Sequence, residues 1–276
     1  MTSPSAAFST VTSADGTTIA YERHGQGPAV VFVDGALSVR GGKADLDELL
    51  APEFTVFRYD RRGRGDSGDT QPYAPEREVE DLAAVIGAAG GTAALYGHSS
   101  GSALVLDAAI TLGPDVVPKI ALYEAPYSDD PADQPRWRAY LTELAVTLAD
   151  GRNGDAVALF MTLVGMPAEQ VDQLRRSPWF PALEGIAPTL AYDHAGLMGP
   201  ERAVPVAKAG KVAVPALVMY GGASVAFMRA AARSLSQAIP GAELRELGGQ
   251  DHNVAAAALA PILASFLAGS AAGAAG

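Results

Sequence analysis

Short hydrophobic runs alternate with stretches of helical periodicity along the first half of the chain. Four runs rich in β-branched and aromatic residues predict buried strands over Ala29–Val33, Thr55–Tyr59, Thr92–Tyr96 and Lys119–Tyr123. Between them, apolar residues at helical spacing predict helices over Lys43–Leu50, Glu76–Ala88 and Leu104–Leu112. An antiparallel strand is expected over Thr17–Glu22, after the Asp15-Gly16 turn. This alternation predicts an α/β fold with a mostly parallel central sheet flanked by helices.

The pattern changes between about residues 126 and 210, where helical periodicity occurs without clear strands. Strands and helices then alternate again over Ala216–Tyr220, Val225–Ala238, Glu243–Leu247 and Val254–Leu267. A helical insert between two parts of one sheet is expected to lie over the strand ends as a cap. We therefore predict a core domain formed by residues 1–125 and 211–276, and a helical cap formed by residues 126–210.

Composition and charge exclude several classes of protein. The 276 residues are 49% hydrophobic and 18% charged, which excludes wholesale disorder. A net charge of −11 without a cluster of basic residues disfavours binding to nucleic acid or to anionic membranes. The absence of cysteine excludes disulfides and cysteine nucleophiles. Four histidines without paired-ligand spacing indicate no metal site, and we expect no cofactor.

The cellular location is predicted from the length of the hydrophobic runs and from the first ten residues. None reaches the roughly 18–20 residues of a membrane span, and the first ten residues do not resemble a secretory signal. We therefore expect a soluble cytoplasmic protein that acts on a small molecule, with its oligomeric state left open.

The strongest chemical signal is Gly97-His98-Ser99-Ser100-Gly101. It follows a predicted strand and opens a predicted helix, which is the context that a G-x-S-x-G nucleophile motif requires. A serine at such a sharp turn needs small neighbours, and the turn lifts its hydroxyl clear of the sheet. The Ser100 amide lies at a helix N-terminus, where unpaired N–H groups favour a developing negative charge.

Four segments of the chain resemble motifs of the serine-type α/β-hydrolase family and follow one another in the family's order. The resemblance is to the cap-bearing branch, which contains esterases, lactonases and epoxide hydrolases. The four segments are Val33–Ala36, Asp60–Ser67, the Ser99 turn and Gly249–His252. The resemblance implies the α/β-hydrolase fold over nearly the whole chain. It also implies a catalytic triad with Ser99 as nucleophile and His252, on a loop before the last helix, as base. A serine at position 99 disfavours epoxide hydrolase chemistry, for which the resemblance would require aspartate.

The acid of the triad departs from the common pattern of the family. Its usual place after the strand Ala216–Tyr220 holds Ser224, which carries no carboxylate. A second family solution places the acid at the end of the preceding strand, where Glu124 stands. Glu124 is therefore the expected acid, and Asp129 and Asp130 are the alternatives. If Glu124 is structural instead, we expect it to cap a helix or to pair with an arginine.

The resemblance also implies an oxyanion hole formed by the backbone N–H groups of Ala36 and Ser100. Asp34 stands where the family usually has histidine. An ionised Asp34 that points inward would oppose the oxyanion, whereas one that points away and accepts turn amides would be structural. Asp34 is thus a possible substrate-site residue. The arginines of Asp60–Ser67 favour a pinned turn over an anion site.

These features predict a carboxylic ester hydrolase that cleaves a small to medium, largely apolar ester or lactone through an acyl-enzyme on Ser99. Two alternatives stay open. One is a non-hydrolytic biosynthetic enzyme, such as a cyclase or a carbon–carbon bond former, on the same scaffold. The other is a ligand-binding protein with little turnover.

Overall fold

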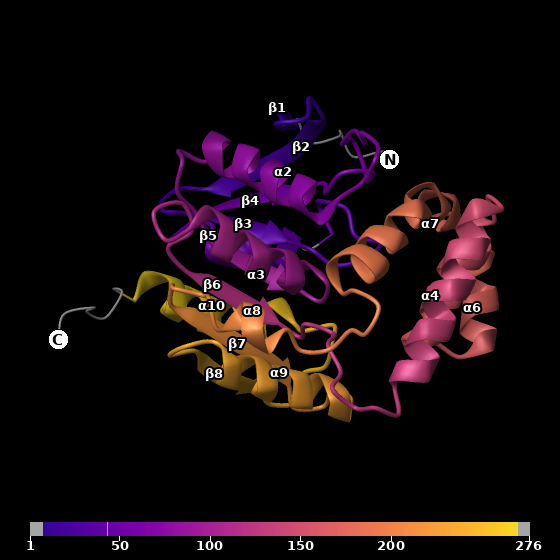
Figure 1. Ribbon diagram of the computed structural model, residues 1–276. Coiled ribbons are helices and arrows are strands. Elements are labelled where there is room, and N and C mark those ends of the chain that lie inside the picture. The colour runs from indigo at the N-terminus through magenta and orange to yellow at the C-terminus, as the bar shows by residue number, and fades with distance from the viewer. Residues whose placement is uncertain (1–7, 43, 270–276) are drawn as a thin grey trace.

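A computed structural model describes residues 8–42 and 44–269 of the chain (Figure 1). Eight strands form one sheet in the order β1-β2-β4-β3-β5-β6-β7-β8. Their bounds are β1 Ser9–Thr12, β2 Thr18–Gly25, β3 Ala29–Val33, β4 Thr55–Tyr59, β5 Ala94–His98, β6 Ile120–Tyr123, β7 Ala216–Gly221 and β8 Glu243–Leu247. β2 pairs antiparallel with both β1 and β4, and every other pairing is parallel. The predicted mostly parallel sheet is therefore confirmed.

Helices cover both faces of this sheet. They are α1 Ala44–Leu50, α2 Pro75–Ala88, α3 Gly101–Leu112, α8 Val206–Ala209, α9 Ala226–Ala238 and α10 Ala256–Ala268. Apolar residues of α2, α3 and α9 pack on one face, and those of α1 and α10 pack on the other. Strands β3, β5, β6 and β7 lie between the two layers, which explains why their sequences are almost continuously hydrophobic.

Several strand boundaries differ from the prediction, and the difference at β5 bears on the site. The strand expected over Thr92–Tyr96 begins at Ala94 and continues to His98, inside the serine motif. Gly97 pairs with Val33 of β3, and His98 pairs with Tyr123 of β6. The ladder therefore carries the sheet directly up to Ser99, although glycine and histidine are weak strand formers.

Residues 126–210, here called the helical insert, lie between β6 and β7 in the sequence. They form α4 Gln134–Ala149, α5 Asn153–Leu163, α6 Ala168–Arg175, α7 Phe180–Ile186, a short 3₁₀ turn Ala187–Thr189 and the π-helical segment η2, Tyr192–Leu197. The last residues of this range form α8, which packs against α9 of the core. The helix expected near Leu183–Tyr192 is thus divided into α7 and two irregular turns. Figure 1 shows α4, α6 and α7 together at one side of the sheet.

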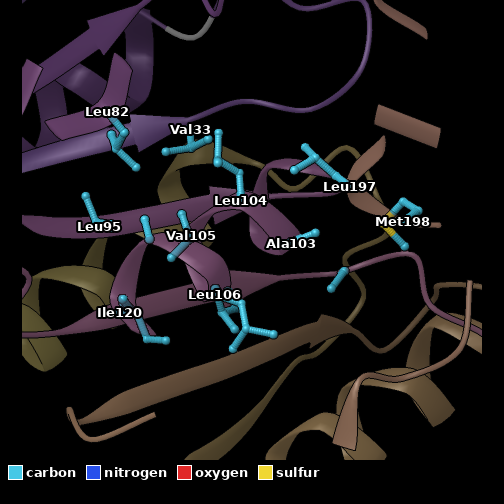
Figure 2. Close-up of a cluster of buried hydrophobic side chains, with 14 of the residues drawn as sticks. Val33, Leu82, Leu95, Ala103, Leu104, Val105, Leu106, Ile120, Leu197 and Met198 are labelled. Atoms are coloured by element: carbon cyan, nitrogen blue, oxygen red, sulfur yellow. The ribbon is translucent and has the colours of Figure 1, made fainter. Parts of the chain in front are cut away.

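The helical insert reaches the core through η2. Leu197 and the next residue, Met198, belong to the same buried cluster as Ala103 and Leu104 of α3, as Figure 2 shows. The end of the insert is therefore anchored next to the helix that begins at the serine motif. No helix in the described part of the chain has the length and apolar character needed to cross a membrane.

Candidate active site

Ser99 occupies a strained turn between β5 and α3. Its φ is +56°, in the left-handed region that a non-glycine residue rarely adopts. A Cβ on Gly97 would lie 2.6 Å from the Cα of Ser102, and one on Gly101 would lie 2.1 Å from the carbonyl oxygen of Val33. Both glycines are therefore required by close backbone approach, as the motif predicts.

Glu124 and His252 form a hydrogen-bonded pair. Glu124 follows β6 and is almost completely buried, and its Oε2 lies 2.8 Å from Nδ1 of His252. Because an ionised carboxylate only accepts hydrogen bonds, Nδ1 carries the proton and Nε2 is left as an acceptor. The imidazole side chain is 39% exposed, so Nε2 is accessible to a reacting group.

The other oxygen of Glu124 is held by the turn after β7. The Gly221 amide donates to Oε1 at 2.8 Å, and the Ser224 hydroxyl donates to the same oxygen. Burial disfavours the charge on Glu124, but these hydrogen bonds and that of His252 outweigh it and lower the pKa of the carboxyl. Ser224 therefore holds the Glu124 carboxylate from the position where the resemblance first suggested an acid, a role that the sequence did not reveal.

The loop that carries His252 is attached to the ends of β5 and β6. Nε2 of His98 donates to the His252 carbonyl oxygen at 2.9 Å, and the Tyr123 hydroxyl donates to that of Asp251 at 2.6 Å. The rings of His98 and His252 lie 4.8 Å apart between centroids. His98 thus positions the loop of the imidazole, although it belongs to the nucleophile motif.

Ser99 makes no hydrogen bond to His252 within the described residues. Its amide donates to the Tyr123 carbonyl oxygen at 2.9 Å, which fixes Ser99 beside the strand that precedes Glu124. Contacts between a nucleophile and its base are often long before substrate binds. Cooperation between Ser99 and His252 therefore stays a prediction.

The loop after β3 lies against the nucleophile. A Cβ on Gly35 would lie only 2.8 Å from Ser99 Cβ and 3.3 Å from Ser99 Oγ, so a side chain at position 35 would displace Ser99. Arg64 Nη1 donates to the Gly35 carbonyl oxygen at 2.8 Å, which directs the Ala36 N–H of the same trans peptide away from Arg64. Within the described chain, neither the Ala36 nor the Ser100 amide donates a hydrogen bond. Both amides are available as oxyanion donors.

Known proteins share this architecture. The sequence model of the alpha/beta hydrolase family matches residues 20–263. The chain belongs to the α/β hydrolase family. An alpha/beta hydrolase from Sphaerobacter thermophilus is 50% identical, with a TM-score of 0.83 over 94% of this chain and 100% of that chain.

More distant solved structures share the fold of this hydrolase. The enol-lactonase from Burkholderia xenovorans is 23% identical, with a TM-score of 0.65 over 95% of this chain and 99% of that chain. The esterase from Thermogutta terrifontis is 22% identical, with a TM-score of 0.66 over 90% of this chain and 92% of that chain. The family and fold expected from the four segments are thus confirmed.

Asp34 of this α/β hydrolase is paired with a buried arginine. Its Oδ2 lies 3.0 Å from Nη1 of Arg58, and the Nε of Arg58 also donates to Asp47 at 2.8 Å. This cation is a different partner from the turn amides expected for Asp34. Arg58 directs the Asp34 carboxylate towards the β4 side of the loop, although it shares its single positive charge between Asp34 and Asp47.

The Asp60–Ser67 segment is a pinned turn, as predicted. Arg61 donates twice to Glu78, with both distances 2.6 Å, and Arg62 donates twice to Asp81, with both distances 2.7 Å. All four side chains are buried. Because carboxylates of the protein occupy these guanidinium groups, the alternative of an external anion site at this segment is not supported.

Asp193, in η2 of the helical insert, joins this turn to the nucleophile motif. Its carboxylate accepts from Arg61 and Arg64 at 2.6 Å each, and from the Ser100 hydroxyl at 2.8 Å. The residue is fully buried. Burial opposes its charge, but the two arginines outweigh that effect and hold the pKa at about 2.

Sequence reasoning missed Asp193. It lies 93 residues from Ser100 and 132 residues from Arg61, and the only local signal is a carboxylate within an otherwise apolar stretch. One buried charge therefore connects the insert, the arginine turn and both sides of the candidate oxyanion hole.

Proposed function

We propose that this α/β hydrolase cleaves a small to medium, largely apolar ester or lactone through an acyl-enzyme on Ser99. The observation that carries the proposal is the buried Glu124 carboxylate. It accepts a hydrogen bond from His252 Nδ1 at 2.8 Å, and the Gly221 amide and the Ser224 hydroxyl donate to its other oxygen. In the neutral imidazole such a pair places the proton on Nδ1, so that the lone pair on Nε2 can accept a proton from a serine hydroxyl.

The reaction follows from these positions. His252 Nε2 takes the proton of Ser99 as Oγ attacks the carbonyl carbon, and the Ala36 and Ser100 amides stabilise the resulting oxyanion. The imidazolium, stabilised by Glu124, then gives its proton to the leaving alkoxide, and the C–O bond breaks. A water molecule, deprotonated by His252, attacks the acyl group and releases the acid and free Ser99.

The helical insert supports the choice of substrate. We propose that residues 126–210 act as a cap over the site, and that residues 1–125 and 211–276 form the catalytic domain. The buried aromatic residues of the insert would enclose an apolar acyl or alcohol group. A cytoplasmic location and a small-molecule substrate belong to the same proposal.

The structure gives less support to the two alternatives, a non-hydrolytic enzyme and a ligand-binding protein. A non-hydrolytic enzyme was suggested by Asp34 and by the missing aspartate at position 224. Asp34 now has Arg58 as its partner, and Ser224 supports Glu124 directly. No observation in the described residues specifically favours a binding protein without turnover.

Labelling with a fluorophosphonate and turnover of p-nitrophenyl esters test the proposal. The native chain should be labelled and should release p-nitrophenol. Ser99→Ala should abolish labelling and lower kcat by at least about 10³-fold. Ser236→Ala, on the surface of α9, is the matched control and should behave as the native chain. Labelling without turnover of any ester would favour the non-hydrolytic enzyme, and absence of labelling would refute a reactive Ser99.

A further inference from the structure

Arg202 lies between the helical insert and the core, in the loop between η2 and α8. Its side chain is 12% exposed, and its backbone is held at a φ of +52°. The guanidinium carbon lies 4.8 Å from the ring centroid of Trp137 in α4 and 5.0 Å from that of Phe227 in α9. Two aromatic faces therefore enclose a positive charge that is largely removed from water.

The Arg202 guanidinium donates no hydrogen bond to any described residue. Its acidic neighbour among these residues is Asp133, at an N–O distance of 3.5 Å without a hydrogen bond. The nearest Asp133 oxygen already accepts the Ser128 hydroxyl at 2.6 Å. Nε of Arg202 is buried and has no partner in the described part of the chain. A donor left unpaired in a buried position is costly, and an arginine carries five donors in all.

The rings around Arg202 connect it to both sides of the candidate active site. Trp137 packs edge-on against His194, at 5.5 Å between centroids, and His194 follows Asp193, which binds Ser100. Phe227 lies in the first turn of α9, three residues after Ser224, whose hydroxyl binds Glu124. A ligand group at Arg202 would thus lie where the insert meets the elements that carry the triad.

We propose that Arg202 is a subsite for a carboxylate group of the substrate. A planar carboxylate matches the two-pronged geometry of a guanidinium and supplies the acceptors that this side chain lacks. The flanking aromatic rings suit an apolar chain attached to that carboxylate. The inference rests on the proposed function and narrows it to an ester or lactone with a mainly apolar body and one free carboxylate.

Direct binding of a probe tests the subsite without turnover. Glutarate should bind the native chain, as measured by calorimetry, and Arg202→Met should weaken that binding at least about tenfold. Arg138→Met removes an exposed arginine of the same insert, paired with Glu201, and should bind glutarate as the native chain does. If Arg202→Met fails to fold by circular dichroism, Arg202→Lys keeps the charge without the planar fork and should still weaken binding. Equal binding to all variants, or no binding to the native chain, would overturn the subsite.

Kinetics separate failure of the subsite from failure of the proposed function. The substrates are mono-p-nitrophenyl glutarate and the matching ester with a terminal amide. Arg202→Met should lower kcat/KM for the carboxylate ester at least about tenfold more than for the amide ester. An equal loss on both esters would refute the subsite and leave the hydrolase proposal intact. Arg202-dependent glutarate binding without turnover of either ester would refute only hydrolysis of these esters.

Discussion

Two histidines of this hydrolase lie in opposite environments. His252 donates to the Glu124 carboxylate and keeps 39% of its side chain exposed. His194 is buried in the helical insert among aromatic rings, with its Nδ1 2.8 Å from the Tyr140 hydroxyl. Burial lowers the pKa of His194 to about 4, so it stays neutral at pH 7. The comparison shows that a carboxylate partner and access to substrate, rather than the residue type, identify the candidate base.

Replacement of the two histidines should give the largest difference in activity between these two environments. His252→Gln should lower kcat/KM by about 10⁴-fold or more, because it removes the group proposed to accept the Ser99 proton. His194→Gln should cost far less activity, since its imidazole has no carboxylate partner that prepares it as a base. Steady-state kinetics on a p-nitrophenyl ester measure both. A similar loss for the two variants would contradict the assignment of His252 as the base.

The acid should rank next. Glu124→Gln retains the shape but removes the charge that stabilises the imidazolium, and kcat should fall by about 10³- to 10⁴-fold. Asp129→Asn and Asp130→Asn are the controls, because Asp129 accepts the Val204 amide and Asp130 the Ala132 amide. If either control lost more activity than Glu124→Gln, the acid of the triad would have to be reassigned.

Asp193 should have a smaller effect on activity and a large one on stability. Asp193→Asn leaves Arg61 and Arg64 without their shared charge, which should lower the free energy of unfolding by about 3–5 kcal/mol. Displacement of the Ala36 and Ser100 amides should also reduce kcat by about 10²-fold in the folded variant. Urea unfolding, and kinetics at a temperature where the variant is folded, measure the two effects.

Asp155→Asn is the matched control for Asp193, because Asp155 also pairs with two arginines of the insert but at the surface. Its loss of stability should stay below about 1 kcal/mol. An Asp193→Asn variant that is less stable but keeps the native kcat would limit Asp193 to a role in folding.

The smallest effect concerns the pH dependence of stability. The pKa of His194 is about 4 in the folded chain and near its ordinary value of 6.5 when unfolded, so the unfolded state binds more protons between these pH values. The contribution of neutral His194 to the free energy of unfolding is complete above the pKa of the unfolded chain, and it declines as the pH falls towards 4. Between pH 7 and pH 5 this residue should account for a loss of about 2 kcal/mol. His194→Gln should remove that part of the slope in urea titrations, and an unchanged slope would contradict it.

The sequence predicted those parts of the site that depend on local pattern. Ser99 was found because a strand, a G-x-S-x-G turn and a helix follow one another within a few residues. Glu124 was found because the usual position holds Ser224 and the preceding strand ends in a carboxylate. The hydrogen bonds of Glu124 to His252 Nδ1 and to the Gly221 amide agree with that interpretation. The catalytic roles themselves stay predictions.

Contacts between distant segments were not predictable in the same way. Asp193 and Arg202 lie in a stretch without strand periodicity, and their environment depends on how the insert folds back on α3 and α9. The partner of Asp34 is on a neighbouring strand, and a charged residue inside the hydrophobic run Thr55–Tyr59 gave no sign of its direction. Burial and pairing of charges are set by the tertiary structure, which a single sequence does not specify.

The place of Glu124 directly after β6 divides the proposed triad into a rigid part and an adjustable part. β5 and β6 are adjacent, with His98 opposite Tyr123, so the ladder itself sets the spacing between the residues that follow each strand. Those residues are Ser99 and Glu124. His252 alone sits on a loop, and a shift of that loop would switch the chemistry off without disturbing the sheet. A partner or a bulky substrate that controlled this hydrolase would therefore need to move only the short loop that carries His252.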